Sequence, residues 1–73
     1  MIQKEHSYLL KFGDQVRKKR RAQKISQKQL AFETGLTRES INRIENGKIN
    51  ISLTNILKIS EALSLTPKEL LDF

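Results

Sequence analysis

One short stretch of the sequence, residues 38–46, places planar polar side chains along one face of a helix. With 3.6 residues per turn, "RESINRIEN" turns Ile41 and Ile44 to the same side. The opposite side carries Glu39, Asn42, Arg43 and Asn46. Arginine forms paired hydrogen bonds with guanine, asparagine does so with adenine, and glutamate accepts a bond from cytosine. Taken alone, this row is also what an ordinary solvated helix face looks like.

Glu45 differs from that row because it lies on the apolar side, one turn after Ile41. A buried carboxylate is tolerated only where a partner charge and hydrogen bonds replace its lost water. The basic run "RKKRR" offers a partner, since Arg20 falls one turn after Val16 on the inward stripe of the preceding helix. We therefore expect a buried ion pair between Arg20 and Glu45. The other four residues of the run are expected on solvated faces, some of them near phosphates.

The whole chain is short and basic, and its charge is unevenly distributed. It has 73 residues, no cysteine and a formal net charge of +6. Residues 1–48 hold twelve Lys and Arg against five Asp and Glu, whereas residues 49–73 hold two against three. This asymmetry indicates a surface that binds a polyanion. From charge alone, a soluble protein with an ordinary charged surface explains it equally well. Disulfides and thiolate metal sites are excluded, and we expect neither a signal peptide nor a membrane span.

The elements that position these residues are all expected to be helices. Apolar residues recur at spacings of three and four, and only one proline occurs. We predict a first helix at about residues 7–22, with residues 1–6 flexible. Ser26 starts the second helix as an N-cap, and Gln29 completes a capping box. Gly35 ends that helix in the left-handed conformation.

Three further helices are expected after this turn. Thr37 caps the third, which ends at Asn46 and Gly47, and either Asn50 or Ser52 opens the fourth. "TPKE" is a capping box that opens a short fifth helix. The inward face of the fourth is predicted to consist of Leu53, Ile56, Leu57, Ile59, Ser60 and Leu63.

A glycine-containing turn joins the second and third predicted helices, which is the arrangement of a helix-turn-helix unit, although plain helical bundles also contain it. The runs "SQKQLA", "GLTRESINRIENGK" and "LTNILKISEALSLTPKELL" resemble the lambda-repressor/Cro-type helix-turn-helix family, also called the XRE family. The resemblance covers about residues 12–71. It implies an all-α, compact five-helix lambda-repressor-like DNA-binding domain over residues 1–73, with its motif at about 27–46.

Three residues depart from the usual pattern of that family. Lys24 and Ser64 stand where glycine is usual, after the first and fourth helices, and Ile51 stands where proline is common. Glycine is favoured where the backbone is left-handed, so these departures affect the geometry of loops. They do not affect the predicted fold.

The resemblance also implies a role for each polar residue of the motif. In this family the third helix lies in the major groove with its N-terminal residues at base edges. The implied base-reading residues are Thr37, Arg38, Glu39, Asn42 and Arg43. The implied phosphate-binding residues, which set the register on DNA without reading sequence, are Ser26, Gln27, Asn46, Gly47 and Lys48. The family has the same buried pair that the spacing of Arg20 and Glu45 predicts.

These implications predict a sequence-specific regulator of transcription that binds double-stranded DNA at a palindromic operator. Small phage regulators and the controller proteins of restriction-modification systems are equally similar to the chain. An antitoxin, which would bind a toxin protein as well as DNA, is the alternative. We expect a cytoplasmic, nucleoid-associated protein from a prokaryote or phage. No enzyme, cofactor, small-molecule ligand or metal site is expected, and His6 stands alone.

The C-terminal residues "ELLDF" predict a second partner, another copy of the chain. A short terminal helix cannot bury every apolar side chain against one thin core, and an exposed apolar patch usually marks an interface. The near-neutral charge of residues 49–73 would let two copies approach. Leu70 is expected to point inward. The interface candidates are Ile49, Ile51, Leu71 and Phe73. The alternative is a monomer whose tail folds back over its own core.

Overall fold

Five helices and no strands make up residues 3–73, the part of the chain that the computed structural model describes. They are α1 (Gln3–Ala22), α2 (Gln27–Thr34), α3 (Arg38–Glu45), α4 (Leu53–Ala62) and α5 (Pro67–Leu70). The all-α, five-helix prediction is confirmed. The first helix begins at Gln3 rather than near residue 7, so it is about one turn longer than predicted. The first two residues lie outside the described part.

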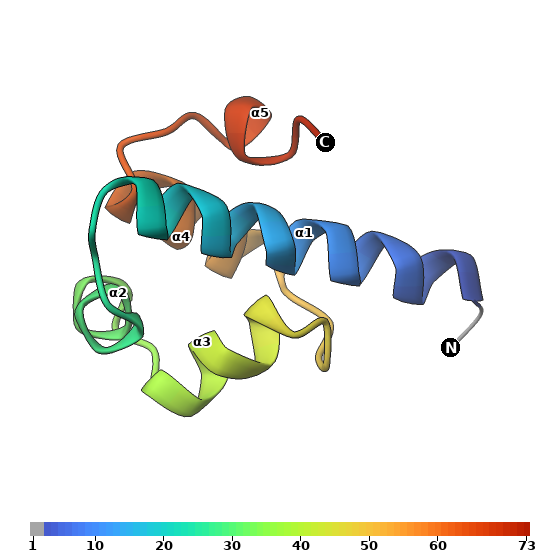
Figure 1. Cartoon of the computed structure of the whole chain (residues 1–73), viewed down its shortest axis with the longest axis horizontal. Helices are drawn as coiled ribbons and strands as arrows, with labels where there is room; N and C mark the ends of the chain where they lie inside the picture. The colour runs from blue at the N-terminus through green and yellow to red at the C-terminus, as the bar shows by residue number, and fades with distance from the viewer. Residues whose placement is uncertain (1–2) are drawn as a thin grey trace.

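The long helix α1 runs across the molecule and supports the others (Figure 1). In this view α2 and α3 lie on one side of α1, α5 lies on the other, and α4 lies behind it. A single apolar core fills the space between the helices. Its buried side chains are Phe12, Val16, Leu30, Ala31, Ile41, Ile44, Ile59, Leu63 and Leu70. The small side chain of Ala31 fits the close crossing of α2 and α3, and Leu36 packs against the core below the turn.

Hydroxyl side chains define where four of the helices begin. Ser26, Thr37, Ser52 and Thr66 have extended backbone conformations, and each side chain accepts a hydrogen bond from the N–H three residues later. Such caps satisfy N–H groups that have no partner within the helix. The capping box of α5 is complete. The box predicted for α2 is half formed, because Gln29 donates its backbone N–H to Ser26 Oγ while its own side chain is exposed.

The inward face of α4 is narrower than predicted. Ile59, Ser60 and Leu63 are buried, but Leu53 is 68% exposed and Leu57 is 47% exposed. These two leucines are four residues apart and therefore share one side of the helix. Because apolar residues occur nearly all round this short helix, its sequence alone does not indicate which side faces the core.

Two tight features of the backbone bring the helices together. Lys24 and Ser64 have φ values of 58° and 57°, so the left-handed turns expected at the family's glycine positions form even without glycine. Gly13, in the middle of α1, is needed for a different reason. A Cβ atom added there would lie 2.3 Å from the carbonyl oxygen of Ile44. The absence of a side chain at Gly13 is therefore what lets α1 touch the end of α3.

Candidate nucleic-acid interface

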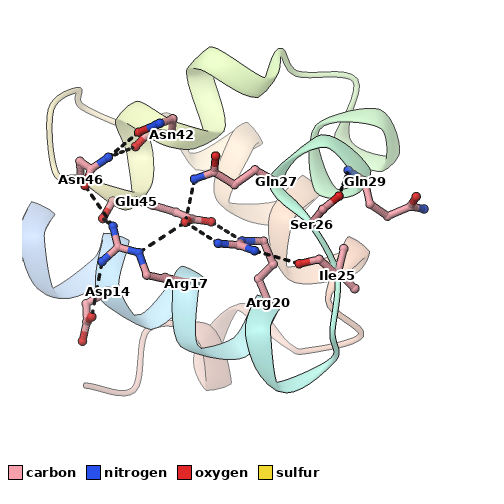
Figure 2. Close-up of polar contacts among 10 residues, drawn as sticks. All are labelled: Asp14, Arg17, Arg20, Ile25, Ser26, Gln27, Gln29, Asn42, Glu45 and Asn46. Carbon is pink, nitrogen blue, oxygen red and sulfur yellow. Dashed lines mark hydrogen bonds and ion pairs between the residues drawn. The ribbon is translucent and has the colours of Figure 1, made fainter.

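The inward carboxylate of Glu45 and the guanidinium of Arg20 lie together in the core, as their spacing predicts. Arg20 Nε is 2.7 Å from Glu45 Oε2, and Arg20 Nη2 is 3.0 Å from Glu45 Oε1, so the contact is bidentate (Figure 2). The residues are 8% and 2% exposed. The hydrogen bond to Glu45 raises the pKa of Arg20 above its ordinary value, against the opposing effect of burial. Arg20 remains a cation and neutralises the buried anion.

Glu45 receives two further donors that were not predicted from the sequence. Gln27 Nε2, on α2, donates to Glu45 Oε1 at 3.1 Å. Arg17, on α1, places Nε 3.6 Å from the same oxygen and donates from Nη2 to the backbone oxygen of Glu45 at 3.0 Å. Arg17 lies one turn before Arg20, and that spacing was the available signal. The Glu45 carboxylate thus links α1 and α2 to α3. It holds the helix-turn-helix unit, α2 and α3, against α1.

The five predicted base-reading residues all lie at the surface on or beside α3. Thr37, Arg38, Glu39, Asn42 and Arg43 are exposed, while Ile41, Ile44 and Glu45 on the other face are buried. In Figure 1 the side of α3 away from α1 faces open space. This division gives one helix with a row of solvent-exposed polar side chains, which is the geometry that a major groove admits. Base reading itself stays a prediction.

Two of these residues engage each other. Arg43 Nη2 lies 2.6 Å from Glu39 Oε1, one turn earlier on the same helix. Both side chains are more than half exposed, so the pair is worth about 0.3–0.5 kcal/mol. An interaction this weak holds the Arg43 fork in place without preventing a base or phosphate from competing for it.

The predicted phosphate-binding residues are less free than their sequence positions indicate. The Gln27 amide nitrogen is directed at Glu45, and the Ser26 hydroxyl is the N-cap of α2. After α3, the backbone N–H of Gly47 donates to the carbonyl oxygen of Ile44 at 3.1 Å. The backbone N–H of Lys48 donates to the carbonyl oxygen of Arg43 at 2.9 Å. The backbone N–H groups of Gly47 and Lys48 are therefore already engaged within the protein. The ammonium of Lys48 is exposed and suited to contact a phosphate.

The predicted dimer candidates separate into two groups. Leu71 and Phe73 are 44% and 49% exposed, whereas Ile49 and Ile51 are partly buried against the core. The C-terminal segment is attached to α1, because Gln15 Nε2 donates to the backbone oxygens of Glu69 and Asp72. Leu70 is fully buried, as predicted. The exposed residues Leu53 and Leu57 of α4 add apolar surface that the sequence analysis had assigned to the core.

Other kinds of site lack support within residues 3–73. No group of three or more His, Cys, Asp or Glu side chains in this part could hold a metal ion. None of its helices is long and apolar enough to cross a membrane.

Comparison with known proteins places the chain in a family. The helix-turn-helix family matches residues 16–70, and the chain belongs to this family in its XRE-type form. It is 52% identical over 65 residues to control protein C.BamHI of Bacillus amyloliquefaciens, covering 88% of this chain and 80% of that protein. It is 40% identical over 62 residues to control protein C.MunI of a Mycoplasma species, covering 84% of each.

Solved structures agree with this assignment. The fold matches the restriction-modification controller protein C.AhdI from Aeromonas hydrophila with a TM-score of 0.86 and 45% identity, covering 89% of this chain and 94% of that one. A hypothetical transcription factor, NHTF from Neisseria, matches with a TM-score of 0.84 and 31% identity, covering 92% and 77%. The family and these relatives assign the chain to DNA-binding regulation of transcription. Their names give no support to the antitoxin alternative.

Proposed function

We propose that this protein is a controller of a restriction-modification system that places α3 in the major groove of a palindromic operator. The observation that carries the proposal is the division of α3 into two faces. On one face, Glu45 is buried and accepts hydrogen bonds from Arg20 of α1 and Gln27 of α2. On the other face, the five predicted base-reading residues are exposed. The printed names of the similar controller proteins support the biological role.

Within this proposal the exposed residues divide by the chemistry they offer. Arg38 and Arg43 supply planar forks that match guanine, and Asn42 and Glu39 supply donors and acceptors for other bases. Lys48, beyond the end of α3, supplies a point charge for a phosphate. Phosphate contacts fix the register and contribute a salt-dependent, sequence-independent part of the affinity. Base contacts provide the discrimination between operator and other DNA.

The test begins with selection of bound sequences from a random DNA pool, which identifies the operator. Arg43→Ala should then weaken operator binding by about 1–3 kcal/mol and change binding to random DNA much less. Lys48→Ala is the matched control, since it removes one cation from the same end of the motif. It should weaken binding to all sequences alike and reduce the salt dependence. Equal losses on operator and random DNA for Arg43→Ala would overturn the assigned role.

We further propose that two copies act together on the operator. A single domain reads one half-site, and a symmetric dimer presents two recognition helices about 34 Å apart to successive turns of the groove. The exposed side chains of Leu71 and Phe73 support an interface at the C-terminal end. Residues 49–73 carry two basic and three acidic side chains, so repulsion there is small.

Sedimentation at micromolar concentration tests the dimer. The wild type should sediment with twice the mass of the chain, and Leu71→Glu should convert it to a monomer that remains folded. Lys68→Gln, an exposed change beside Leu71 that removes no apolar side chain and alters the charge by one unit, is the control and should leave the dimer largely intact. A wild-type monomer at these concentrations would exclude the dimer.

A further inference from the structure

Two asparagine side chains at the end of α3 are linked to α1 by a chain of hydrogen bonds. Arg17 Nη2 donates to Asn46 Oδ1 at 3.0 Å. Asn46 Nδ2 in turn donates to the backbone oxygen of Asn42 at 2.8 Å and to Asn42 Oδ1. Figure 2 shows the three side chains in this order, from α1 to the exposed face of α3.

The chemistry of these groups fixes which way each amide faces. A guanidinium has donors only, so Asn46 must present its oxygen to Arg17. Its NH₂ group is then left to face Asn42, which must present its own oxygen in return. The NH₂ group of Asn42 therefore points away from this network. Reversing either amide would set two donors, or two acceptors, against each other.

Arg17 is itself firmly held. Its guanidinium also contacts the backbone oxygen of Glu45 at 3.0 Å and lies 3.9 Å from Asp14 Oδ1. Only 27% of the side chain is exposed. The start of the hydrogen-bond chain therefore lies at the packed contact between α1 and α3, and not on a mobile surface side chain.

We propose that Arg17 is a positioning residue that sets the base preference of Asn42 through Asn46. The inference rests on the proposed role of Asn42 as a base-reading residue. With its oxygen held by Asn46, Asn42 offers the DNA chiefly a donor. Guanine, thymine and, at N7, adenine present acceptors in the major groove, whereas cytosine presents only a donor there. The contacted base is therefore one with an acceptor, and cytosine is rejected.

The first experiment compares two neighbouring cations of α1. The base pair read by Asn42 is identified as the one at which Asn42→Ala removes the preference among the four bases. Arg17→Met should then reduce the preference at that pair by about fivefold or more, the scale of one good base contact. Lys18→Met removes the same charge from an exposed side chain that is also paired with Asp14. It should weaken binding to all four sequences equally.

The second experiment reverses the proposed orientation. In Asn46→Asp the new carboxylate still accepts from Arg17 but has no donor for Asn42. Asn42 must then rotate its NH₂ group inward and present its oxygen to the DNA. The preference at that base pair should move toward cytosine or adenine, whose amino groups are donors. A residue that only stabilised the fold would alter affinity without producing such an inversion.

The outcomes separate the two proposals. If Asn42→Ala changes the preference at no base pair, the base-reading role of Asn42 fails, and this inference fails with it. If Asn42→Ala removes the preference but Arg17→Met behaves like Lys18→Met, Asn42 reads the base and the role of Arg17 is overturned. Should Arg17→Met unfold, Asn46→Asp decides, because Asn46 is exposed. An unchanged preference in that variant overturns the role of Arg17.

Discussion

The buried pair provides the sharpest test of how this small domain is held together. Replacing Glu45 by glutamine leaves Arg20 charged in a site where it is 8% exposed. It also sets an NH₂ group against a donor in either orientation of the new amide, because Arg20 donates to both oxygens of Glu45. Breaking a buried pair costs about 3–5 kcal/mol, and we expect Glu45→Gln near the upper end.

Arg20→Met should reduce the free energy of unfolding by less, about 3 kcal/mol. In that variant the carboxylate keeps its hydrogen bond from Gln27 at 3.1 Å and the charge of Arg17 at 3.6 Å. A domain of this length has a total stability of roughly 4–11 kcal/mol, scaled per residue. Either change therefore removes a large part of it. The double variant Arg20→Met with Glu45→Met should recover most of the loss, because no charge is left unpaired.

Urea unfolding followed by far-ultraviolet circular dichroism gives the free energies of wild type, Arg20→Met, Glu45→Met and the double variant, which together form a double-mutant cycle. Glu45→Gln is measured beside them. The salt dependence of these losses in the free energy of unfolding offers a second check, since salt screens a buried ion pair much less than a surface pair. The exposed ion pair of Arg43 with Glu39 serves as the control, and Glu39→Gln should change stability by less than about 0.5 kcal/mol. Additive losses for Arg20 and Glu45 would refute the reasoning, and so would single losses as small as that of the control.

Three further outcomes follow from the backbone and the caps. Gly13→Ala should destabilise the protein by about 1–3 kcal/mol or more in the same urea assay, because its Cβ would collide with the backbone of Ile44. Ser64→Gly should raise stability by up to about 1 kcal/mol, since its φ of 57° suits glycine; a loss would show that the serine is not strained. Hydrogen bonds from Thr66 lower the pKa of Glu69, so its capping contribution is present above the ordinary glutamate pKa and is lost as the pH falls through the lowered value. Thermal unfolding of Glu69→Ala should accordingly differ from wild type at neutral pH and converge with it in acid.

Much of the architecture was predictable because local signals agree with one another. The caps at Ser26, Thr37 and Thr66 mark helix starts through side-chain chemistry that needs no tertiary structure. The pairing of Arg20 with Glu45 followed from two inward positions of opposite charge. Both kinds of inference use only the periodicity of the helix and the cost of burying a charge.

The features that were not predicted depend on how helices cross. The contacts of Arg17 and Gln27 with Glu45 need the actual distance between α1, α2 and α3, which no single helix encodes. The exposure of Leu53 and Leu57 depends on which side of α4 meets the core. Gly13 was overlooked because a glycine inside a helix has no local signature of a close contact. Each of these is a consequence of packing between elements far apart in sequence.

The two faces of α3 have a consequence for how such a regulator can evolve. Its inward residues stabilise the domain, whereas Arg38, Glu39 and Arg43 are exposed to solvent. Of these three, Glu39 and Arg43 also form an ion pair with each other. Exposed substitutions of this kind usually change stability by less than about 0.5 kcal/mol. Under the proposed base-reading role, a lineage can therefore exchange one operator for another through mutations at these three positions without first acquiring compensating changes in the core. Substitutions at the Thr37 cap or in the Arg17–Asn46–Asn42 chain would instead change stability together with operator preference.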